Sequence, residues 1–590
     1  RPRLRRPQRG RSVPAEKRGE IMKKGLYMGK NTAVVDLSVQ FYSSPEELVS
    51  SEGFRAFLQR YLQDLAVRNI DIYHWLTNSH DPDEIIPPLV TLAKQLLVLD
   101  IEEISSPLLN EVNRMRCLYV VEDSYNYWRS HKRFSILSST ASTVSYRNFI
   151  EADSRYNQVV ITLYRTCEEK LMGMTNKVYR QLQSGTNASA VVRSYKWKVY
   201  SGYGALKSIP FIHRVMLRTP ILFHTESNKR TGTFTELDTN PIRNFYFKPV
   251  EWFCVPLKVN DLLCFVYFNI EYMASGIAAA NLFEMADQNE CENHQPDLIL
   301  LFGNQDDRDS CGFYYDRFND CWIGSVSSDW KIEYFGYMKK AILTLHNLRK
   351  IQQGILPVHG SMLGIVFRDG TRKNVIMMGD SGAGKSESIE AIRRLSNLQH
   401  GNKTIRRIEV IFDDMGSIRL LDGHPVANGT ETGAFVRLDD LDNASAYQDM
   451  ERSIFINPER ENARVILPVS PFEVVTTNHR IDMVLYANNY EEKTGVERFE
   501  SETQALEVFT SGRRMAMGTT EETGLSSTFL ANPFGPMQKP AESLEICQHI
   551  MHQLFAENIF VGQIYTRLGT SDKEKIADSA AELLNLLQNM

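Results

Sequence analysis

The sequence has few cysteines, no long apolar run and no large excess of one charge. Its eight cysteines include no CxxC pair, which argues against a zinc knuckle, a thioredoxin-type motif and a dense disulfide framework. No stretch approaches the roughly eighteen apolar residues that a membrane-spanning helix needs. Basic and acidic residues number 67 and 72, which gives no electrostatic reason to expect nucleic acid or an anionic membrane as a partner. We therefore expect a cytoplasmic protein with reduced thiols.

The composition is that of a globular protein. Hydrophobic residues make up 43% of the chain and charged residues 24%, so wholesale disorder and collagen-like structure are excluded. No internal repeat and no low-complexity tract is visible. A chain of 590 residues is long enough for two or three domains, or for one large enzyme core with an accessory lobe.

Residues 1–21 differ from the rest of the chain. They hold eight basic and two acidic side chains but lack the apolar stretch of a secretory signal. We predict a disordered basic tail.

Apolar periodicity divides the remaining chain into three parts. Helical spacing recurs between Pro45 and Arg116 and predicts a helical N-terminal lobe over residues 22–150. Short β-branched and aromatic runs separated by Pro, Asn and Asp predict a mixed α/β segment over 151–296. Strands and helices then interleave to the end of the chain, which predicts an α/β core over 297–590.

The most specific motif is a glycine loop of the form GxxxxGK[ST]. An apolar run, Val375–Met378, precedes it and predicts a buried strand, and a helical pattern, Ser388–Leu395, follows it. Strand, loop and helix in this order surround an anion with backbone N–H groups and a helix N-terminus. The loop predicts a nucleotide phosphate site made of Gly379, Asp380, Ser381, Gly382, Ala383, Gly384, Lys385 and Ser386.

The chemistry of such loops assigns roles to two side chains. Lys385 is expected to reach the β and γ phosphates, and Ser386 to ligate a divalent ion. A second apolar run after the loop is predicted to be a strand that ends in the carboxylates Asp413 and Asp414, which are suited to hold Mg²⁺ or Mn²⁺ beside the phosphates. Upstream, His359 precedes another strand-like run and is placed at the start of the same sheet.

Six landmarks occur along the second half of the chain: Tyr334–Lys340, His359–Ser361, Gly379–Ser386, Asp413–Asp414, Asn462–Pro468 and Gly518–Glu521. They resemble those of ATP-dependent phosphoenolpyruvate carboxykinases and occur in the same order. The resemblance covers roughly Pro296 to Leu587 and implies an α/β fold with a carboxykinase-like nucleotide- and metal-binding core.

The resemblance implies a function and a set of site residues. The reaction would be oxaloacetate and ATP to phosphoenolpyruvate, CO₂ and ADP, with Mn²⁺ or Mg²⁺ as the metal and a small dicarboxylate as the substrate. Lys340, His359 and Asp414 would ligate the metal, and Lys340 would have to be deprotonated to do so. Lys339 would face substrate and nucleotide, and Arg464 would neutralise the transferring phosphate, with Asp413 beside them in the catalytic set.

Two departures keep other functions open. The loop, with the following Glu387, reads more like that of HPr kinase/phosphorylase, which also has a His-Gly pair shortly before its loop. The GRSPKD segment that carries the substrate arginine of the carboxykinases is not found, and Arg243 is the nearest basic candidate. A protein kinase or small-molecule kinase, and a non-catalytic nucleotide-binding module, therefore remain alternatives, as does a donor other than ATP.

One further basic pair has two interpretations. Arg513 and Arg514 follow a helical pattern, Thr503–Phe509, and either approach a phosphate or form a solvated helix end.

Overall fold

The computed structural model describes residues 25–78, 81–138, 146–229, 233–243, 245, 248–305, 311–380, 382–398, 405–438, 450–517, 523–566 and 576–590. The basic tail predicted over 1–21, Ser381 of the phosphate loop and the landmark at 518–521 lie outside these residues. The protein is mixed α/β with large mixed sheets, as the sequence predicted at that coarse level. A helix long and apolar enough to span a membrane is not found within the described ranges.

Contacts divide the chain into two compact units. Unit 1 comprises Arg1–Ser194, Ile209–Arg218 and Lys248–Trp252, and unit 2 comprises Tyr195–Ser208, Thr219–Phe247 and Phe253–Met590. This division differs from the boundaries placed after residues 150 and 296, and helix α7 (Tyr146–Met172) runs across the first of them.

Unit 1 contains a mixed sheet as well as helices. Strand β2 pairs antiparallel with β1 and parallel with β3, β3 pairs parallel with β4, and β4 pairs antiparallel with β5. Three of these strands fall within residues 22–150, for which a helical lobe was expected; β1 and β2 have too few residues to show a clear period. The strands are β1 (Leu26–Met28), β2 (Thr32–Asp36), β3 (Lys132–Ser138), β4 (Ala188–Arg193) and β5 (Phe211–Leu217).

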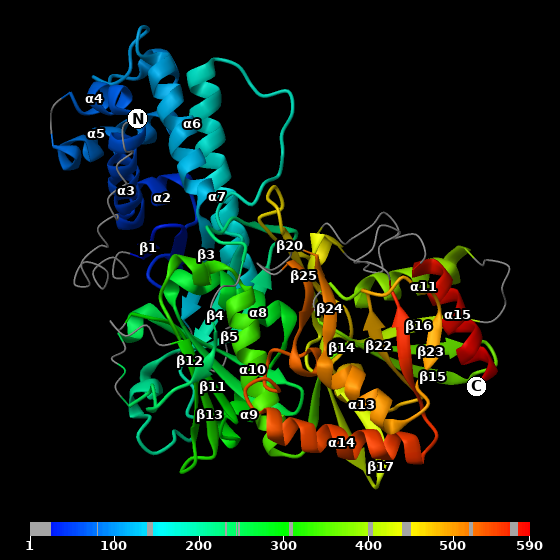
Figure 1. The fold of residues 1–590 in the computed structure, drawn as a ribbon. Helices are drawn as coiled ribbons and strands as arrows, with labels where there is room; N and C mark the ends of the chain where they lie inside the picture. Colours follow the sequence, from blue (N-terminus) through cyan, green and yellow to red (C-terminus); the bar gives the residue numbers. More distant parts are fainter. Residues whose placement is uncertain are drawn as a thin grey trace, which may run out of the picture. The chain divides into compact units, whose positions relative to one another are not determined.

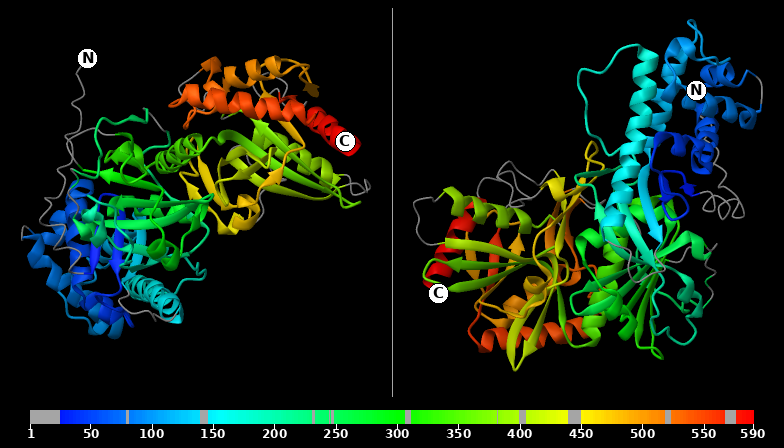
Figure 2. Two further views of the ribbon diagram at one scale, coloured as in Figure 1. Left: turned by 90° about the horizontal axis from the view of Figure 1, so that it is seen from below. Right: turned by 180° about the vertical axis from the view of Figure 1, so that it is seen from behind.

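The helices of unit 1 confirm the periodicity seen in the sequence. Side chains of Ser44, Ser51, Asn69 and Asp81 cap four of them by accepting a hydrogen bond from a backbone N–H of the first turn. Helix α7 lies alongside α6 and is drawn in cyan in Figures 1 and 2. The other helices are α2 (Pro45–Ser50), α3 (Glu52–Arg68), α4 (Ile70–Thr77), α5 (Pro82–Val98) and α6 (Arg114–Ser130).

Unit 2 includes a sheet that precedes the phosphate loop in sequence. Its strands lie in the order β8, β9, β11, β13, β12, β7, and β9, β11 and β13 are parallel neighbours. Helix α8 (Met273–Leu282) packs on β9, and α10 (Gly336–Gln352) packs on β11 and β13. The strands are β8 (Trp252–Val259), β9 (Leu262–Asn269), β11 (Leu298–Asn304), β13 (Cys321–Ser327), β12 (Cys311–Asp316) and β7 (Thr235–Glu236), with β10 (Glu284–Met285) on β8.

The phosphate loop belongs to a second sheet of eight strands in unit 2. Its order is β21 (His479–Arg480), β17 (His424–Gly429), β16 (Ile405–Leu421), β14 (Leu356–Phe367), β15 (Arg372–Met378), β22 (Met483–Asn488), β26 (Phe560–Tyr565) and β23 (Val496–Arg498). Strand β15 pairs antiparallel with β14 and parallel with β22.

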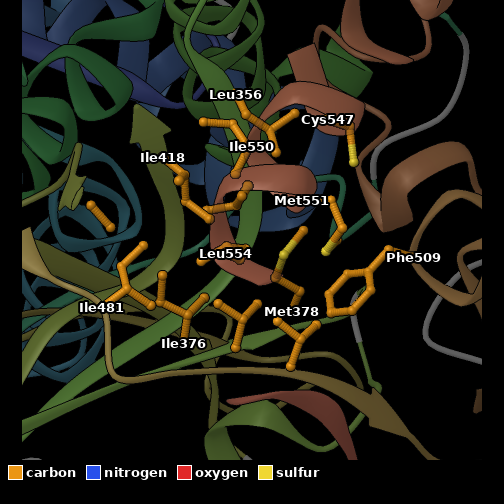
Figure 3. Close-up of a cluster of buried hydrophobic side chains, with 14 of the residues drawn as sticks. Leu356, Ile376, Met378, Ile418, Ile481, Phe509, Cys547, Ile550, Met551 and Leu554 are labelled. Carbon is orange, nitrogen blue, oxygen red and sulfur yellow. The ribbon is translucent and has the colours of Figure 1, made fainter. Parts of the chain in front are cut away.

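Side chains on both faces of this sheet are buried. Alternate residues of β15 point to opposite faces and therefore enter two different cores. Figure 3 shows one core, in which Ile376 and Met378 of β15 meet Ile550, Met551 and Leu554 of helix α14 (Pro540–Ala556). The intervening residues of β15 pack instead against α11 (Lys385–Leu398) and α15 (Ile576–Asn589). Helix α13 (Glu502–Ser511) shares the first core. The carboxyl end of β15 is thus held rigidly where the loop begins.

Two smaller sheets complete unit 2. One has the order β18 (Gly433–Arg437), β20 (Arg464–Pro468), β19 (Ile454–Ile456), β6 (Ile221–Phe223). The other is the hairpin of β24 (Arg513–Met517) and β25 (Thr523–Ser527).

Candidate active site

The register of three strands brings the sequence landmarks together. Gly360 of β14 pairs with Met378 of β15 on one side and with Asp414 of β16 on the other. The backbone N–H of Gly379 then donates to the carbonyl of His359 at 3.0 Å. The start of β14, the middle of β16 and the phosphate loop therefore meet at one edge of the sheet.

Strand β16 differs from the prediction in one respect. It continues through Asp413 and Asp414 to Leu421, so the paired carboxylates lie within the strand and not at its end. The chain reverses only at Asp422 and Gly423, both with positive φ, before β17. The antiparallel partners β14 and β17 keep this stretch extended, and pairing, which the local sequence does not reveal, decides where the strand stops.

Several carbonyl groups of the phosphate loop are bound by side chains from other strands. The Asn489 amide, just after β22, donates to the Gly382 carbonyl at 3.0 Å, and the Thr566 hydroxyl, just after β26, donates to the Ala383 carbonyl at 2.7 Å. Because C=O and N–H of a trans peptide point in opposite directions, the bond from Thr566 turns the N–H of Gly384 the other way. Such outward carbonyls and inward N–H groups suit an anion site.

Glycine is required at Gly384 by both backbone and space. Its φ is +95°, and a Cβ atom there would lie 2.5 Å from the Cβ of Thr566. Gly382 also has positive φ, at 79°.

Lys385 begins helix α11 beneath the loop. Its ammonium donates to the carbonyls of Gly379 at 2.6 Å and Asp380 at 3.1 Å, and the side chain is buried. Burial lowers the pKa of Lys385, and the charges of Asp414, Asp380 and Asp413 act in the opposite direction. The ammonium of Lys385 thus lies against the backbone of the loop.

Asp380, the second residue of the loop, has a buried ionic partner. Arg514 Nε of β24 lies 3.2 Å from Asp380 Oδ2, and the Thr528 hydroxyl donates to the same oxygen at 3.0 Å. Both charged side chains are at least nine-tenths buried. The interpretation of Arg514 as a solvated helix end is therefore wrong, whereas its neighbour Arg513 is exposed.

His359 is held in one orientation by a backbone carbonyl. The Ala531 carbonyl lies 2.9 Å from Nδ1, and a carbonyl can only accept, so Nδ1 carries the proton. Ala531 and Leu530 both have positive φ, of 50° and 54°, a strained backbone of the kind that is retained at functional sites. Burial, together with the charge of Lys385, lowers the pKa of His359, which favours the neutral ring.

The other ring nitrogen of His359 contacts a carboxylate. Its Nε2 lies 2.9 Å from Asp414 Oδ1, at hydrogen-bond distance. An imidazole and a carboxylate are ligands that suit Mn²⁺. This geometry fits the metal that the resemblance implies.

Two lysines of α10 complete the cluster around Asp414. Lys339 Nζ lies 2.5 Å from Asp414 Oδ2 and 2.9 Å from Glu431 Oε1, and Lys340 Nζ lies 3.4 Å from Asp414 Oδ2. Burial opposes the charge of Lys339, but the two carboxylates outweigh it and raise its pKa. Burial also opposes the charge of Asp414, yet Lys339 and Lys340 hold its pKa well below the usual range.

The predicted metal ligands Lys340, His359 and Asp414 thus converge. In the residues that the structure describes, no group of three or more His, Cys, Asp and Glu side chains has metal-site geometry. A metal here would require Lys340, which pairs with Asp414 as a cation, to lose its proton, and would need further ligands from the phosphate loop or nucleotide.

Arg464 of β20 and Lys339 of α10 both lie close to the aromatic ring of Phe435. Arg464 Cζ and Lys339 Nζ each lie 5.5 Å from the centre of the Phe435 ring. The Asn462 side chain accepts a hydrogen bond from Arg464 Nη2 at 2.9 Å, which fixes the guanidinium.

The remaining predicted residues are placed as follows. Asp413 is half-buried on β16 opposite Ser361, and Ser386 lies in the first turn of α11. Arg243 is an exposed residue in a turn that begins at Asn240. Its backbone N–H donates a hydrogen bond to the Asn240 carbonyl.

Sequence reasoning missed four residues of the site: Glu431, Phe435, Asn489 and Thr566. Each acts through contacts with distant segments, and none belongs to a motif that its neighbours make visible. Searches among protein-family models and among curated proteins give no match for this chain.

Proposed function

We propose that the chain is an ATP- and divalent-metal-dependent phosphotransferase that converts oxaloacetate and ATP to phosphoenolpyruvate, CO₂ and ADP. The observation that carries this proposal is the convergence of Lys339, Lys340, His359 and Asp414 beside the phosphate loop. These residues come from three elements: α10 and β14, which are consecutive, and β16, which follows later in the sequence.

Each residue has a role that follows from its charge and position. Lys385 binds the β and γ phosphates from below the loop, and the backbone N–H groups of the loop orient them. Arg464 and Lys339, which share the Phe435 ring, offset negative charge on the phosphoryl group and on the acceptor.

His359 and Asp414, with Lys340 and Ser386, would hold the divalent ion, which when bound offsets charge on the phosphate oxygens. The Ala531 carbonyl keeps Nε2 of His359 available for this purpose. In the reaction, the C–C bond to the leaving CO₂ breaks, its electron pair forms the enolate, and the enolate oxygen takes the γ-phosphoryl group from ATP.

A kinase that phosphorylates a protein or small-molecule hydroxyl is a second candidate. The observation in its favour is the set of residues in the loop, with Asp380, Ala383 and Glu387, together with the missing GRSPKD segment. The same phosphate and metal groups would serve this reaction, and only the acceptor differs.

One assay separates these functions. Purified protein with Mn²⁺, ATP and oxaloacetate should form phosphoenolpyruvate and CO₂ in equal amounts, and the Lys385→Ala variant should not. Transfer of the labelled γ-phosphate to a seryl hydroxyl without CO₂ release would instead support the kinase. Nucleotide binding with neither activity would overturn both and support a regulatory module.

A further inference from the structure

Unit 1 contains an apolar cavity between its helices and the β1–β2 pair. The cavity has a volume of about 160 Å³ and is lined by residues of α2, α3, α5, α6 and α7. These helices are coloured blue to cyan in Figures 1 and 2. Natural protein interiors contain few voids larger than a water molecule, so a space of this size needs an explanation.

A second chamber adjoins the first. It has a volume of about 70 Å³ and shares five wall residues with the larger one: Leu89, Ala93, Val120, Val121 and Cys167. Its other walls are almost wholly apolar and include Trp75, Leu96 and Leu171. The two chambers therefore lie next to each other between α5, α6 and α7.

The walls carry no charge. Of the lining residues that the structure describes, none is Asp, Glu, Lys, Arg or His. An ion placed here would lose its hydration without a partner, which is strongly unfavourable. The occupant must therefore be uncharged.

Several polar groups on the walls are already used. The Trp128 N–H donates to the Ser184 carbonyl, the Tyr61 hydroxyl to Asp123, and the Tyr164 hydroxyl to Glu122. These groups therefore contribute mainly apolar ring surface to the cavity.

The hydroxyl of Tyr125 differs from these groups because, in the described part of the chain, it is not used in this way. Its side chain lines the larger chamber and is 93% buried, since 7% is exposed. Its ring stacks on Tyr164 with centroids 3.9 Å apart, which fixes its direction. Within the described residues its buried hydroxyl has no hydrogen-bond partner, and a buried hydroxyl without one is destabilising.

We propose that unit 1 binds an uncharged, elongated, hydrocarbon-rich molecule with one polar atom that pairs with the Tyr125 hydroxyl. The two chambers would take an alkyl chain or a ring with a short tail. An apolar cavity of roughly 150 Å³ is large enough to bind benzene, and the larger chamber here is of that size. This site is separate in sequence from the phosphate site and does not depend on the proposed function.

The test uses straight-chain alcohols as probes of the full chain. Titration calorimetry of 1-butanol, 1-hexanol and 1-octanol should give one saturable site. Affinity should rise about fourfold for each added methylene, until the chain fills both chambers. Absence of saturable binding by all three alcohols would overturn the proposal.

A wall variant locates the binding. Ala93 lines both chambers, so Ala93→Phe should lower the affinity for 1-octanol at least tenfold. The control Val98→Phe lies on the same helix, where Val98 is 70% exposed, and should leave the affinity unchanged. If Ala93→Phe does not fold, Ala93→Val serves in its place with a smaller loss. Unchanged affinity in a folded Ala93 variant would contradict the proposed site.

A second variant tests the polar contact. Phenol and toluene have nearly the same shape, but only phenol can pair with Tyr125. Tyr125→Phe should weaken phenol binding about fivefold, the effect of one hydrogen bond, and leave toluene binding within about twofold. An equal effect on both probes would mean that the hydroxyl does not recognise the ligand.

Discussion

The guanidinium of Arg514 lies 3.2 Å from the carboxylate of Asp380, and both side chains are buried. The pair connects the β24–β25 hairpin to the second residue of the phosphate loop. Asp380 therefore helps to hold the loop in place, although the motif specifies no residue type at this position.

Removing one partner of this pair should destabilise unit 2. Arg514→Met removes the cation that lies 3.2 Å from the buried Asp380 carboxylate, and a loss of roughly 3 kcal/mol in unfolding free energy is expected. Urea unfolding followed by tryptophan fluorescence measures this loss. The double variant Arg514→Met/Asp380→Asn should recover much of it, and Arg513→Met, at the exposed neighbour, should have little effect. Equal losses in the single and double variants would show that the two side chains are not coupled.

Lys385→Ala should leave the fold intact and reduce turnover. The ammonium acts on phosphate charge in a shielded position, so a loss on the order of 10² or more is expected. Lys373→Ala is the control, because Lys373 lies near the other end of β15 and pairs with Asp482 at 3.6 Å. Steady-state kinetics measure the turnover of both variants. Unchanged turnover in a folded Lys385 variant would contradict the proposal that this loop binds the nucleotide.

The metal prediction concerns His359 and Asp414. His359→Ala or Asp414→Asn should weaken Mn²⁺ binding by about 10–100-fold or more, whereas Lys339→Ala should mainly damage substrate handling. Electron paramagnetic resonance of free Mn²⁺ measures the affinity in nucleotide-free protein. His424→Ala is a matched control, since His424 is exposed and pairs with Glu557. Equal affinities in wild type and both ligand variants would mean that these residues do not bind the metal.

Gly384→Ala should weaken ATP binding by about tenfold or more, because strain at such a position is roughly 1–3 kcal/mol and the new methyl group would meet Thr566. The control Gly370→Ala also has positive φ, of 91°, but a Cβ atom at that position would have no other atom within 4 Å. Equilibrium binding of ATP compares the two variants. Equal affinities would show that contact with Thr566 does not shape the loop.

Stability should fall as the solution is acidified, through His346. Burial, with the charge of Lys350, lowers the pKa of His346 from 6.5 to about 3. Below pH 6.5 the unfolded chain therefore binds a proton that the native state does not, and native stability decreases as pH falls. The contribution between pH 7 and pH 5 is about 2 kcal/mol.

Urea unfolding at the two pH values tests the role of His346. His346→Gln should reduce the difference between pH 7 and pH 5, and His294→Gln, at an exposed position, should not. A difference that is the same in wild type and His346→Gln would contradict this prediction.

The sequence predicted those parts of the fold that repeat a local period. Helices α2 to α5, α13 and α14 follow apolar spacing, and strand β15 with helix α11 follows from the glycine loop between them. The short strands β1 and β2 were not predicted, because three to five residues give too little pattern. The end of β16 was misplaced because its pairing with β14, and not its own residues, keeps it extended.

The residues of the candidate site that were predicted differ from those that were missed in the same respect. Lys385 and Asp414 belong to motifs that can be recognised from the order of their residues, so the sequence predicted both as site residues. Glu431, Asn489 and Thr566 each contribute one side chain from a segment without a motif, and their roles depend on which strands become neighbours. Pairing between distant strands cannot be derived from one sequence by periodicity alone.

The hydrogen bonds from Asn489 and Thr566 to the phosphate loop have a consequence for synthesis of the protein. The loop motif is complete in the nascent chain once Ser386 has been added, but the donors that turn its carbonyl groups outward belong to the segments just after β22 and β26, which emerge much later. A ribosome-bound chain that stops before β26 would therefore carry the whole motif and still lack the shaped anion site. Under the proposed function, ATP would stabilise this protein only after nearly all of it has been made, and would not guide the early steps of folding.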